Sequence, residues 1–177
     1  MIYEFWTDGA SSMKINDKRK YEVIAGGWAW ALIINNKETT FQSGSEAKAT
    51  NQRMELTAIY KALQFYKENY LKMGDIIKIY SDSAYCVNIF QSWIKNWKAN
   101  NWKRKGGKPI ENLELIQKID KLITELEKNF IGILFMHVKA HSTNLWNNYV
   151  DQLAVRAKME LIEEETYNVP EISKFDF

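Results

Sequence analysis

The stretch Ile76-Ile77-Lys78-Ile79-Tyr80-Ser81-Asp82-Ser83 decides the fold of this chain. Its isoleucines and tyrosine form a short, nearly continuous apolar run, which predicts a strand that is buried on both faces of a sheet. A strand of that kind belongs to a sheet with helices packed on its faces. The strand ends at Asp82, so this carboxylate is expected at the carboxyl end of the strand, where open α/β sheets bind their ligands.

The residues before this stretch predict an antiparallel part of the sheet. Residues 2–7 are rich in β-forming side chains and predict a strand that ends at an Asp-Gly pair. Residues 26–34 predict a second strand, and the pair Asn35-Asn36 turns the chain into a third at 38–43. Residues 11–22 are polar and charged, which favours a mobile connection. The three strands together predict an antiparallel meander.

Helical periodicity flanks the stretch on both sides. Residues 51–69 carry apolar side chains at i, i+3, i+4 and i+7, and residues 115–126 form a second, strongly amphipathic pattern. Further helices are expected directly after Ser83 and at 147–161, with a fifth strand at 131–138. This order predicts an α/β fold with a mixed five-stranded sheet, a three-strand antiparallel meander plus two parallel strands, flanked by helices.

Length and composition fit one globular domain. The chain has 177 residues, of which 46% are hydrophobic, enough for a sizeable core. We expect the domain to span residues 1–163 and to be followed by an acidic and aromatic tail, 164–177, without regular structure. Because the first strand starts at Ile2, no separate N-terminal domain is expected.

The sequence also restricts the compartment. No segment is apolar for the length that a membrane span needs, and the N-terminus lacks the pattern of a secretory signal. The single Cys86 excludes a disulfide framework and fits a reducing compartment, with the thiol as a small buried hydrophobe. We therefore expect a cytoplasmic monomer without a membrane partner.

Four acidic residues stand at the ends of apolar runs or inside them, where an uncompensated charge is costly. Asp8 ends the first predicted strand and Asp82 the fourth. Glu55 lies on the same helical stripe as Ile59, and Asp151 lies in the last helix. If the first and fourth strands are parallel neighbours, Asp8 and Asp82 meet at one edge of the sheet.

Each acid alone also has a purely structural explanation. Asp8 before Gly9 is typical of a turn, and Asp82 between two serines is typical of a helix N-cap. Asp151 fits a cap or an exposed helix face, and Glu55 has cations nearby in the sequence. All four explanations would have to hold at once, so one shared cation site is the favoured interpretation. The cations near Glu55 are Lys48, Arg53 and Lys61.

The ligand types indicate which cation. Oxygen ligands, without a cluster of Cys or a His pair at metal-ligand spacing, favour Mg²⁺ or Mn²⁺ over zinc. Two such ions about 4 Å apart can activate water and stabilise the leaving oxygen in phosphodiester cleavage. His141, in a polar loop before Asp151, is either a surface residue or a proton shuttle at this site. His137 lies in the predicted last strand, where a structural role is favoured.

A second feature is a local concentration of positive charge. The formal net charge of the chain is only +2, but residues 83–110 contain six Lys or Arg residues and no Asp or Glu. Trp93 and Trp97 are spaced i, i+4 and could both be core residues, an interpretation that we adopt for Trp93. The unbroken positive charge, with Trp102 amid Asn and Lys residues, favours a groove that follows a phosphate backbone and offers a stacking surface.

Together these blocks resemble a bacterial-type type 1 ribonuclease H over residues 2–157. Residues 92–110, with WIKNWKANNWK followed by GGKPIENLEL, resemble the basic protrusion of that family. The other matching blocks occur in the family's order and spacing: TDGA (7–10), TNQRMEL (50–56), YSDSAY (80–85), VKAHS (138–142) and VDQLA (150–154).

The resemblance implies an endonuclease that hydrolyses the RNA strand of RNA/DNA hybrids and leaves 3′-hydroxyl and 5′-phosphate ends. It implies that Asp8, Glu55, Asp82 and Asp151 bind two Mg²⁺ ions, with Mn²⁺ as a substitute, and that His141 is the family's mobile histidine. The implied substrate contacts are Asn51 and Gln52 near the cut, Lys48, Thr50 and Asn112 at a DNA phosphate, and Trp97, Trp102, Lys98 and Lys103 in the basic protrusion.

The chain departs from the family pattern at three places. A longer charged segment follows Ala10, Ala84 stands where many members have Gln, and Asn147 and Asn148 stand where members often have Glu. No metal ligand is lost, so activity is expected. The alternatives are a related nuclease or strand-transfer enzyme that acts on DNA, and a non-catalytic nucleic-acid-binding module. The four retained carboxylates argue against the second, because binding to a polyanion favours their loss.

Overall fold

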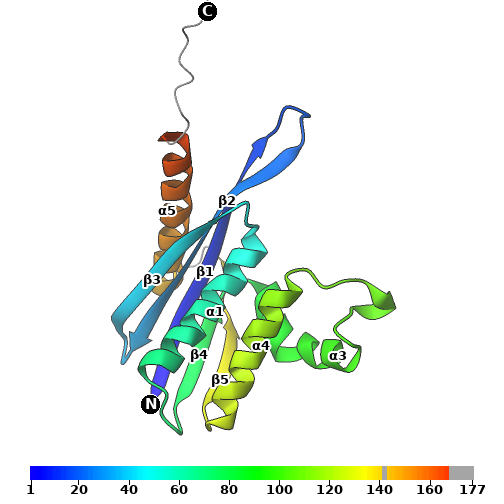
Figure 1. The fold of residues 1–177 in the computed structure, drawn as a ribbon. Helices are drawn as coiled ribbons and strands as arrows, with labels where there is room; N and C mark the ends of the chain where they lie inside the picture. The colour runs from blue at the N-terminus through cyan, green and yellow to red at the C-terminus, as the bar shows by residue number, and fades with distance from the viewer. Residues whose placement is uncertain (141–142, 168–177) are drawn as a thin grey trace, which may run out of the picture.

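A computed structural model describes residues 1–140 and 143–167 of the chain (Figure 1). Its strands form one five-stranded sheet in the order β3-β2-β1-β4-β5. The pairs β1–β2 and β2–β3 are antiparallel, and the pairs β1–β4 and β4–β5 are parallel, which confirms the expected mixed sheet. The strand bounds are β1 Ile2–Ile15, β2 Tyr21–Ile34, β3 Lys37–Ala47, β4 Ile76–Ser81 and β5 Gly132–His137.

Helices cover both faces of this sheet (Figure 1). One face carries α1 and α4, and the other carries α5, which packs on β1, β2 and β3. A third helical segment starts after β4, passes through a π-helical turn and ends beside α4. The bounds are α1 Asn51–Asn69, α2 Ala84–Asn88, π-helical η1 Ile89–Trp93, α3 Ile94–Ala99, 3₁₀-helical η2 Lys105–Gly107, α4 Leu113–Lys128 and α5 Leu145–Tyr167.

Two hydrophobic cores hold these layers together. The larger core lies between the sheet and the α1–α4 layer, and includes the fully buried Phe5, Leu63 and Ile79. The smaller core lies under α5, where Val150 and Ala154 pack against β1 and β2. Burial of this much apolar surface supplies most of the free energy that orders the sheet.

The segment 11–22, expected as a mobile connection, is instead a β-hairpin. β1 does not end at Asp8 but continues to Ile15, which pairs with Tyr21 of β2. The Asp-Gly pair therefore lies within a strand and forms no turn. The charged residues obscured the alternation of β-forming side chains in this segment, and cross-strand pairing then makes it regular.

Two further elements differ from expectation. β4 is not buried on both faces: Ile77 and Ile79 are fully buried, whereas Ile76 on the other side is 36% exposed. The reason is that α5 packs on the β1–β3 part of the sheet and leaves this face of β4 partly open. The last helix continues to Tyr167, past the expected end of regular structure at residue 163, because the intervening glutamates are good helix formers.

None of the helices in the described part of the chain is long and apolar enough to cross a membrane.

Candidate active site

β1 and β4 bring Asp8 and Asp82 together at one end of the sheet. The two strands are parallel neighbours, and their pairing ends one residue before each aspartate. Asp82 is not the N-cap of α2, because the hydroxyl of Ser83 takes that role and accepts a hydrogen bond from the N–H of Cys86 at 3.3 Å. The capping explanation of Asp82 is therefore wrong, and its carboxylate is free to face the site.

Gly9 allows Glu55 to join these two residues. A Cβ atom at Gly9 would lie 2.3 Å from the backbone nitrogen of Glu55 and 2.6 Å from the carbonyl carbon of Met54. Only glycine therefore lets α1 approach β1 this closely. As a result, one carboxylate oxygen from each of Asp8, Glu55 and Asp82 lies within 4.8 Å of the others.

The protein compensates these three carboxylates poorly. Glu55 is 3% exposed, and its Oε2 has no hydrogen-bond partner among the described residues. Asp8 is 5% exposed, and its Oδ1 accepts a hydrogen bond from the N–H of Gly9 at 2.8 Å. Within residues 1–140 and 143–167, no Lys or Arg forms an ion pair with any of the three. Hard oxygen donors that lack a protein cation fit a divalent metal ion.

Burial and mutual repulsion raise the pKa values of this cluster. For Asp8, burial is the main cause and the charge of Asp82 the next, and together they raise the pKa to about 7. For Glu55, burial and then the charge of Asp8 raise the pKa well above its ordinary value. Without a cation the cluster therefore retains protons near neutral pH, and a bound cation would displace them.

α5 presents Asn147 and Asp151 from adjacent turns of the helix. Asn147 is 2% exposed and its Nδ2 donates to Oδ2 of Asp82 at 3.2 Å. The Oδ1 of Asn147 has no partner among the described residues. Asp151 lies outside the 4.8 Å group, but its charge is still one of the minor causes that raise the pKa of Asp8. The structure therefore places Asp151 near the cluster rather than within it.

Asn147 is a site residue that the sequence presented only as a departure from the family pattern. Its i, i+4 spacing from Asp151 is the signal that puts both side chains on one side of the helix. No pattern in the sequence indicated that its partner would be Asp82, 65 residues earlier.

The two histidines differ in what can be said of them. His141 lies outside the described residues. His137 pairs with Ser81 at the end of β5, and its Nε2 lies 3.2 Å from the carbonyl oxygen of Asp82. His137 therefore has a structural role, as expected, because its ring supports the backbone that carries Asp82.

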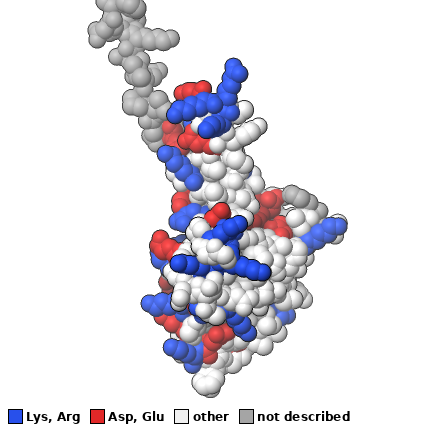
Figure 2. Space-filling model, turned by 90° about the vertical axis from the view of Figure 1, so that its right-hand side faces the viewer, with Lys and Arg blue, Asp and Glu red and all other residues white. Residues whose placement is uncertain are grey.

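The basic segment 92–110 projects from the side of the molecule, and Figure 2 shows Lys and Arg side chains gathered across the middle of that face. Trp93, expected in the core, is 37% exposed, whereas Trp97, expected in a DNA channel, is only 8% exposed. The two rings nevertheless lie side by side, with centroids 5.9 Å apart, as their i, i+4 spacing predicts. A cavity of about 460 Å³ adjoins both rings, and its lining is Gln52, Tyr85, Trp93, Trp97, Arg104 and Glu111.

The other residues expected to bind substrate are in varied settings. Thr50 is the N-cap of α1, and its hydroxyl accepts a hydrogen bond from the N–H of Arg53 at 3.3 Å. Lys98 is paired with Asp120 at 2.6 Å, so its charge is already compensated within the protein. Asn112 precedes α4 in the left-handed conformation. The remaining four are Trp102, which packs partly against the larger core, and Lys48, Asn51 and Lys103, which are exposed.

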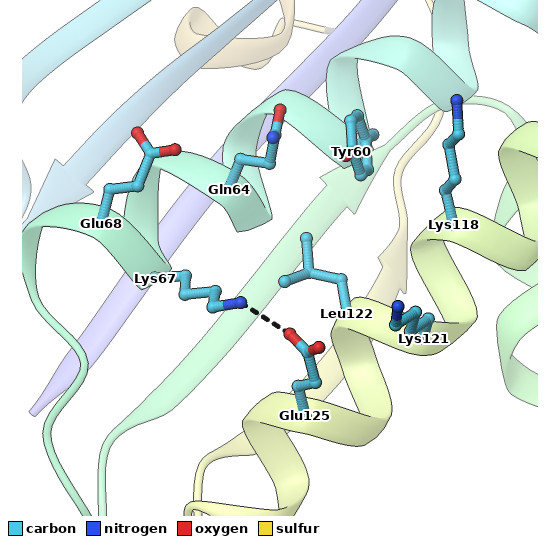
Figure 3. Close-up of a pocket in the computed structure, with 8 residues that line it drawn as sticks. All are labelled: Tyr60, Gln64, Lys67, Glu68, Lys118, Lys121, Leu122 and Glu125. Carbon is cyan, nitrogen blue, oxygen red and sulfur yellow. Dashed lines mark hydrogen bonds and ion pairs between the residues drawn. The ribbon is translucent and has the colours of Figure 1, made fainter.

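A hollow of about 510 Å³ lies between α1 and α4, away from the acids (Figure 3). Lys67 and Glu125 form an ion pair of 2.6 Å across it. Its lining carries charges of both signs and begins at Tyr60, more than one helical turn beyond Glu55. A surface of mixed charge does not match a phosphate backbone, so this hollow is not a candidate for the active site.

Comparison with known proteins identifies the family. A family model described as RNase H matches residues 2–159. The chain belongs to the ribonuclease H family. This ribonuclease H is 41% identical over 150 residues to the Ribonuclease H of Acetivibrio thermocellus, a match that covers 84% of this chain and 89% of the relative. It is 33% identical over 173 residues to the Ribonuclease H of Treponema denticola, covering 92% of this chain and all 100% of the relative.

Solved structures share the fold of this ribonuclease H. LC9-RNase H1, described as a type 1 RNase H with the type 2 active-site motif, superposes with a TM-score of 0.69 at 24% identity, covering 90% of this chain and 72% of that chain. A foamy viral protease-reverse transcriptase in complex with RNA/DNA hybrid superposes with a TM-score of 0.65 at 19% identity, covering 89% of this chain and 20% of that one. The family model and the named relatives make the chain a ribonuclease H, as the sequence resemblance implied, and the solved structures share its fold.

Proposed function

We propose that this ribonuclease H is an endonuclease that hydrolyses the RNA strand of RNA/DNA hybrids and leaves 3′-hydroxyl and 5′-phosphate ends. The observation that carries the proposal is the convergence of Asp8, Glu55 and Asp82 within 4.8 Å, where one Glu55 oxygen has no partner among the residues that the structure describes. The relatives named Ribonuclease H and the foamy viral complex with a hybrid support the choice of substrate.

The three carboxylates, with Asp151 at their edge, would hold two Mg²⁺ ions, for which Mn²⁺ could substitute. Bound there, the ions would supply an activated water and stabilise the leaving oxygen. Asn147 orients the Asp82 carboxylate through its amide hydrogen bond. We assign His141 to proton transfer or product release, a role that rests on the sequence resemblance alone.

Substrate contacts would come from two regions outside the carboxylate cluster. The first region is the start of α1 with the residue that precedes α4, where Lys48, Thr50, Asn51, Gln52 and Asn112 lie. The second is the basic protrusion, 92–110, with Trp97, Trp102, Lys98 and Lys103. The cavity beside Gln52 and Trp93 joins the two regions and offers a path for a nucleic-acid strand. We also propose a cytoplasmic location, which rests on the single, buried Cys86.

The test is incubation of the protein with end-labelled RNA/DNA hybrid, double-stranded RNA or duplex DNA, each with Mg²⁺ or with EDTA. Magnesium-dependent cutting of the RNA strand of the hybrid alone is expected. Cutting of duplex DNA would instead indicate a DNA nuclease or strand-transfer enzyme. Binding of the hybrid without cutting would indicate a non-catalytic module.

A further inference from the structure

The β1–β2 hairpin extends beyond the rest of the sheet as a free ribbon. β1 pairs with β4 only as far as Thr7, and β2 pairs with β3 only from Ala25 onward. Among the described residues, 13–23 therefore have strand partners only in each other, and Figure 1 shows the dark blue hairpin rising past the other strands. At about 3.3 Å per residue, the turn lies roughly 25 Å beyond Asp8. The ribbon is a direct continuation of the strand that carries this catalytic acid.

The turn of the hairpin is ordered and carries three consecutive cations. Asn16 Oδ1 accepts hydrogen bonds from the backbone N–H groups of Lys18 and Lys20, both at 3.0 Å. Arg19 is in the left-handed conformation, with φ of 54°, and its N–H donates to the carbonyl of Asn16 at 2.8 Å. Among the ion pairs of the described residues, none involves Lys14, Lys18, Arg19 or Lys20.

One face of the ribbon also exposes large apolar side chains. Met13 is 62% exposed, Ile15 61% and Tyr21 77%. The register pairs Ile15 with Tyr21 and Met13 with Val23, so these four side chains share one face. A two-stranded ribbon without a third partner is only marginally stable, and its solvent-exposed apolar face indicates that it contacts something outside the described chain.

We propose that this hairpin binds the same nucleic-acid duplex that is cut at the acids, some seven to ten base pairs away from the cut. Lys18, Arg19 and Lys20 would neutralise backbone phosphates, and Tyr21 would lie against the sugars of a groove wide enough for a two-stranded ribbon. Figure 2 shows Lys and Arg gathered at the top of the molecule, where the hairpin ends, on the same face as the basic segment. The hairpin would thus make activity depend on duplex length. This inference rests on the proposed function.

The test compares wild type with the variant Lys18→Gln/Arg19→Asn/Lys20→Gln, in which Asn tolerates the left-handed conformation of residue 19. Binding is measured by fluorescence anisotropy in EDTA, and cleavage in Mg²⁺, on hybrids of 8 and 24 base pairs. For the long hybrid, we expect Kd and KM to rise about tenfold or more with kcat unchanged, and the slope of log K against log salt to fall by about 2–3. For the short hybrid, we expect the two proteins to be equal, which also shows that the variant is folded.

The matched control is Lys37→Gln/Lys72→Gln/Lys128→Gln, which removes the same charge from exposed positions at the opposite end of the sheet. It should bind both hybrids like wild type. Equal affinity of wild type and the hairpin variant for the long hybrid would overturn the inference, and so would a wild-type dimer that the variant converts to a monomer, because the ribbon would then contact a second copy. If wild type cuts neither hybrid, the proposed function itself fails.

Discussion

At the residue scale, the candidate active site holds negative charge that no Lys or Arg of the described residues neutralises. Glu55 and Asp8 are almost completely buried, their pKa values are raised, and one oxygen of Glu55 has no partner in residues 1–140 and 143–167. Ionising such groups costs free energy in the metal-free protein, and a bound cation offsets this cost. Stability, pH and metal binding are therefore linked at these two residues.

Magnesium should stabilise the protein more at pH 8 than at pH 6. The pKa of Asp8 is about 7 in the fold and about 4 in an unfolded chain, so the metal-free fold loses stability as the pH rises through this window. As the proposed ligand, Mg²⁺ would bind the ionised carboxylates, so its stabilising effect should grow over the same window. Thermal melts in EDTA and in Mg²⁺ should show a rise in Tm of several degrees at pH 8 and a smaller one at pH 6.

Glu55→Gln is the control for this linkage. It removes one titrating group, so it should flatten the pH dependence in EDTA and weaken the effect of Mg²⁺ at both pH values. An equal Mg²⁺-induced shift of Tm at pH 6 and pH 8 in wild type would contradict the linkage.

Asn147→Ala should weaken metal binding rather than remove it. The substitution deletes the amide that donates to Asp82 at 3.2 Å, so the carboxylate loses an orienting partner. Loss of such a partner typically lowers metal affinity about 10–100-fold. The cleavage rate measured against Mg²⁺ concentration should shift by that factor and recover at high Mg²⁺. Gln152→Ala, at an exposed position of the same helix, should leave the curve unchanged.

At the element scale, glycines set how closely the helices approach the sheet. A Cβ at Gly9 would collide with α1, and a Cβ at Gly27 would lie 2.1 Å from the carbonyl oxygen of Ala154 in α5. These positions lie on neighbouring strands, where Gly9 pairs with Trp28 and Gly27 with Ala10. Because helices pack closely on both faces of the sheet at these two glycines, Glu55 and the start of α5 come near the end of β4.

We therefore expect Gly9→Ala to lower the cleavage rate strongly and the free energy of unfolding only modestly. The new methyl group must push α1 away from β1, which costs about 1–3 kcal/mol of unfolding free energy and separates Glu55 from Asp8. Urea unfolding and cleavage assays measure the two effects. Gly132→Ala is the matched control, because its Cβ would meet no atom nearer than 3.6 Å, and near-wild-type values are expected. A fully active Gly9→Ala protein would show that this contact is not needed.

Trp97 and Trp93 should have different effects because Trp97 is almost fully buried and Trp93 is partly exposed. Trp97→Ala removes a ring that is 8% exposed and should lower the unfolding free energy by about 3 kcal/mol. Trp93→Ala removes a ring that is 37% exposed and should change stability by less than about 1 kcal/mol, while raising KM for the hybrid. Denaturant unfolding and steady-state kinetics distinguish the two variants, and the reverse pattern would contradict the observed burial of the two rings.

At the scale of the whole molecule, the buried acids at the two ends of the sheet differ in their hydrogen-bond partners. Asp75, 2% exposed at the end that holds the N-terminus, accepts hydrogen bonds from the N-terminal amine at 2.8 Å and from the Tyr66 hydroxyl at 2.9 Å. At the other end, one carboxylate oxygen of Glu55 has no hydrogen-bond partner within the described part of the chain. One end therefore stabilises the fold, and the other remains available for a ligand.

Asp75→Asn should destabilise the fold at neutral pH and matter less in acid. Burial alone would raise the pKa of Asp75, but hydrogen bonds from the N-terminal amine and Tyr66 outweigh it and lower the pKa. A lowered pKa adds stability above the ordinary Asp value, and this stability is lost as the pH falls through the folded value. Urea unfolding at pH 7 should show a loss of about 2–3 kcal/mol that shrinks in acid. Asp17→Asn, in the exposed hairpin turn, should change stability by less than about 0.5 kcal/mol.

The sequence by itself determined the order of the elements, the mixed sheet and the meeting of Asp8 with Asp82. Periodicity and strand ends are local properties of a chain, and parallel neighbours place their carboxyl ends at one edge. The position of Glu55 on an apolar stripe was also readable, because a charge on the core side of a helix needs a partner. For Asp151 the sequence indicated the neighbourhood but not its place at the edge of the cluster.

Only the tertiary structure decided the remaining features. Packing left Trp93 more exposed than Trp97, cross-strand pairing made residues 11–22 a hairpin, and Asn147 donates a hydrogen bond to Asp82, 65 residues earlier in the chain. Each of these features depends on contacts between residues that are distant in sequence, and a local periodicity does not predict such contacts. Such contacts form only when the layers pack, because packing determines which side chains are buried and which polar atoms find partners.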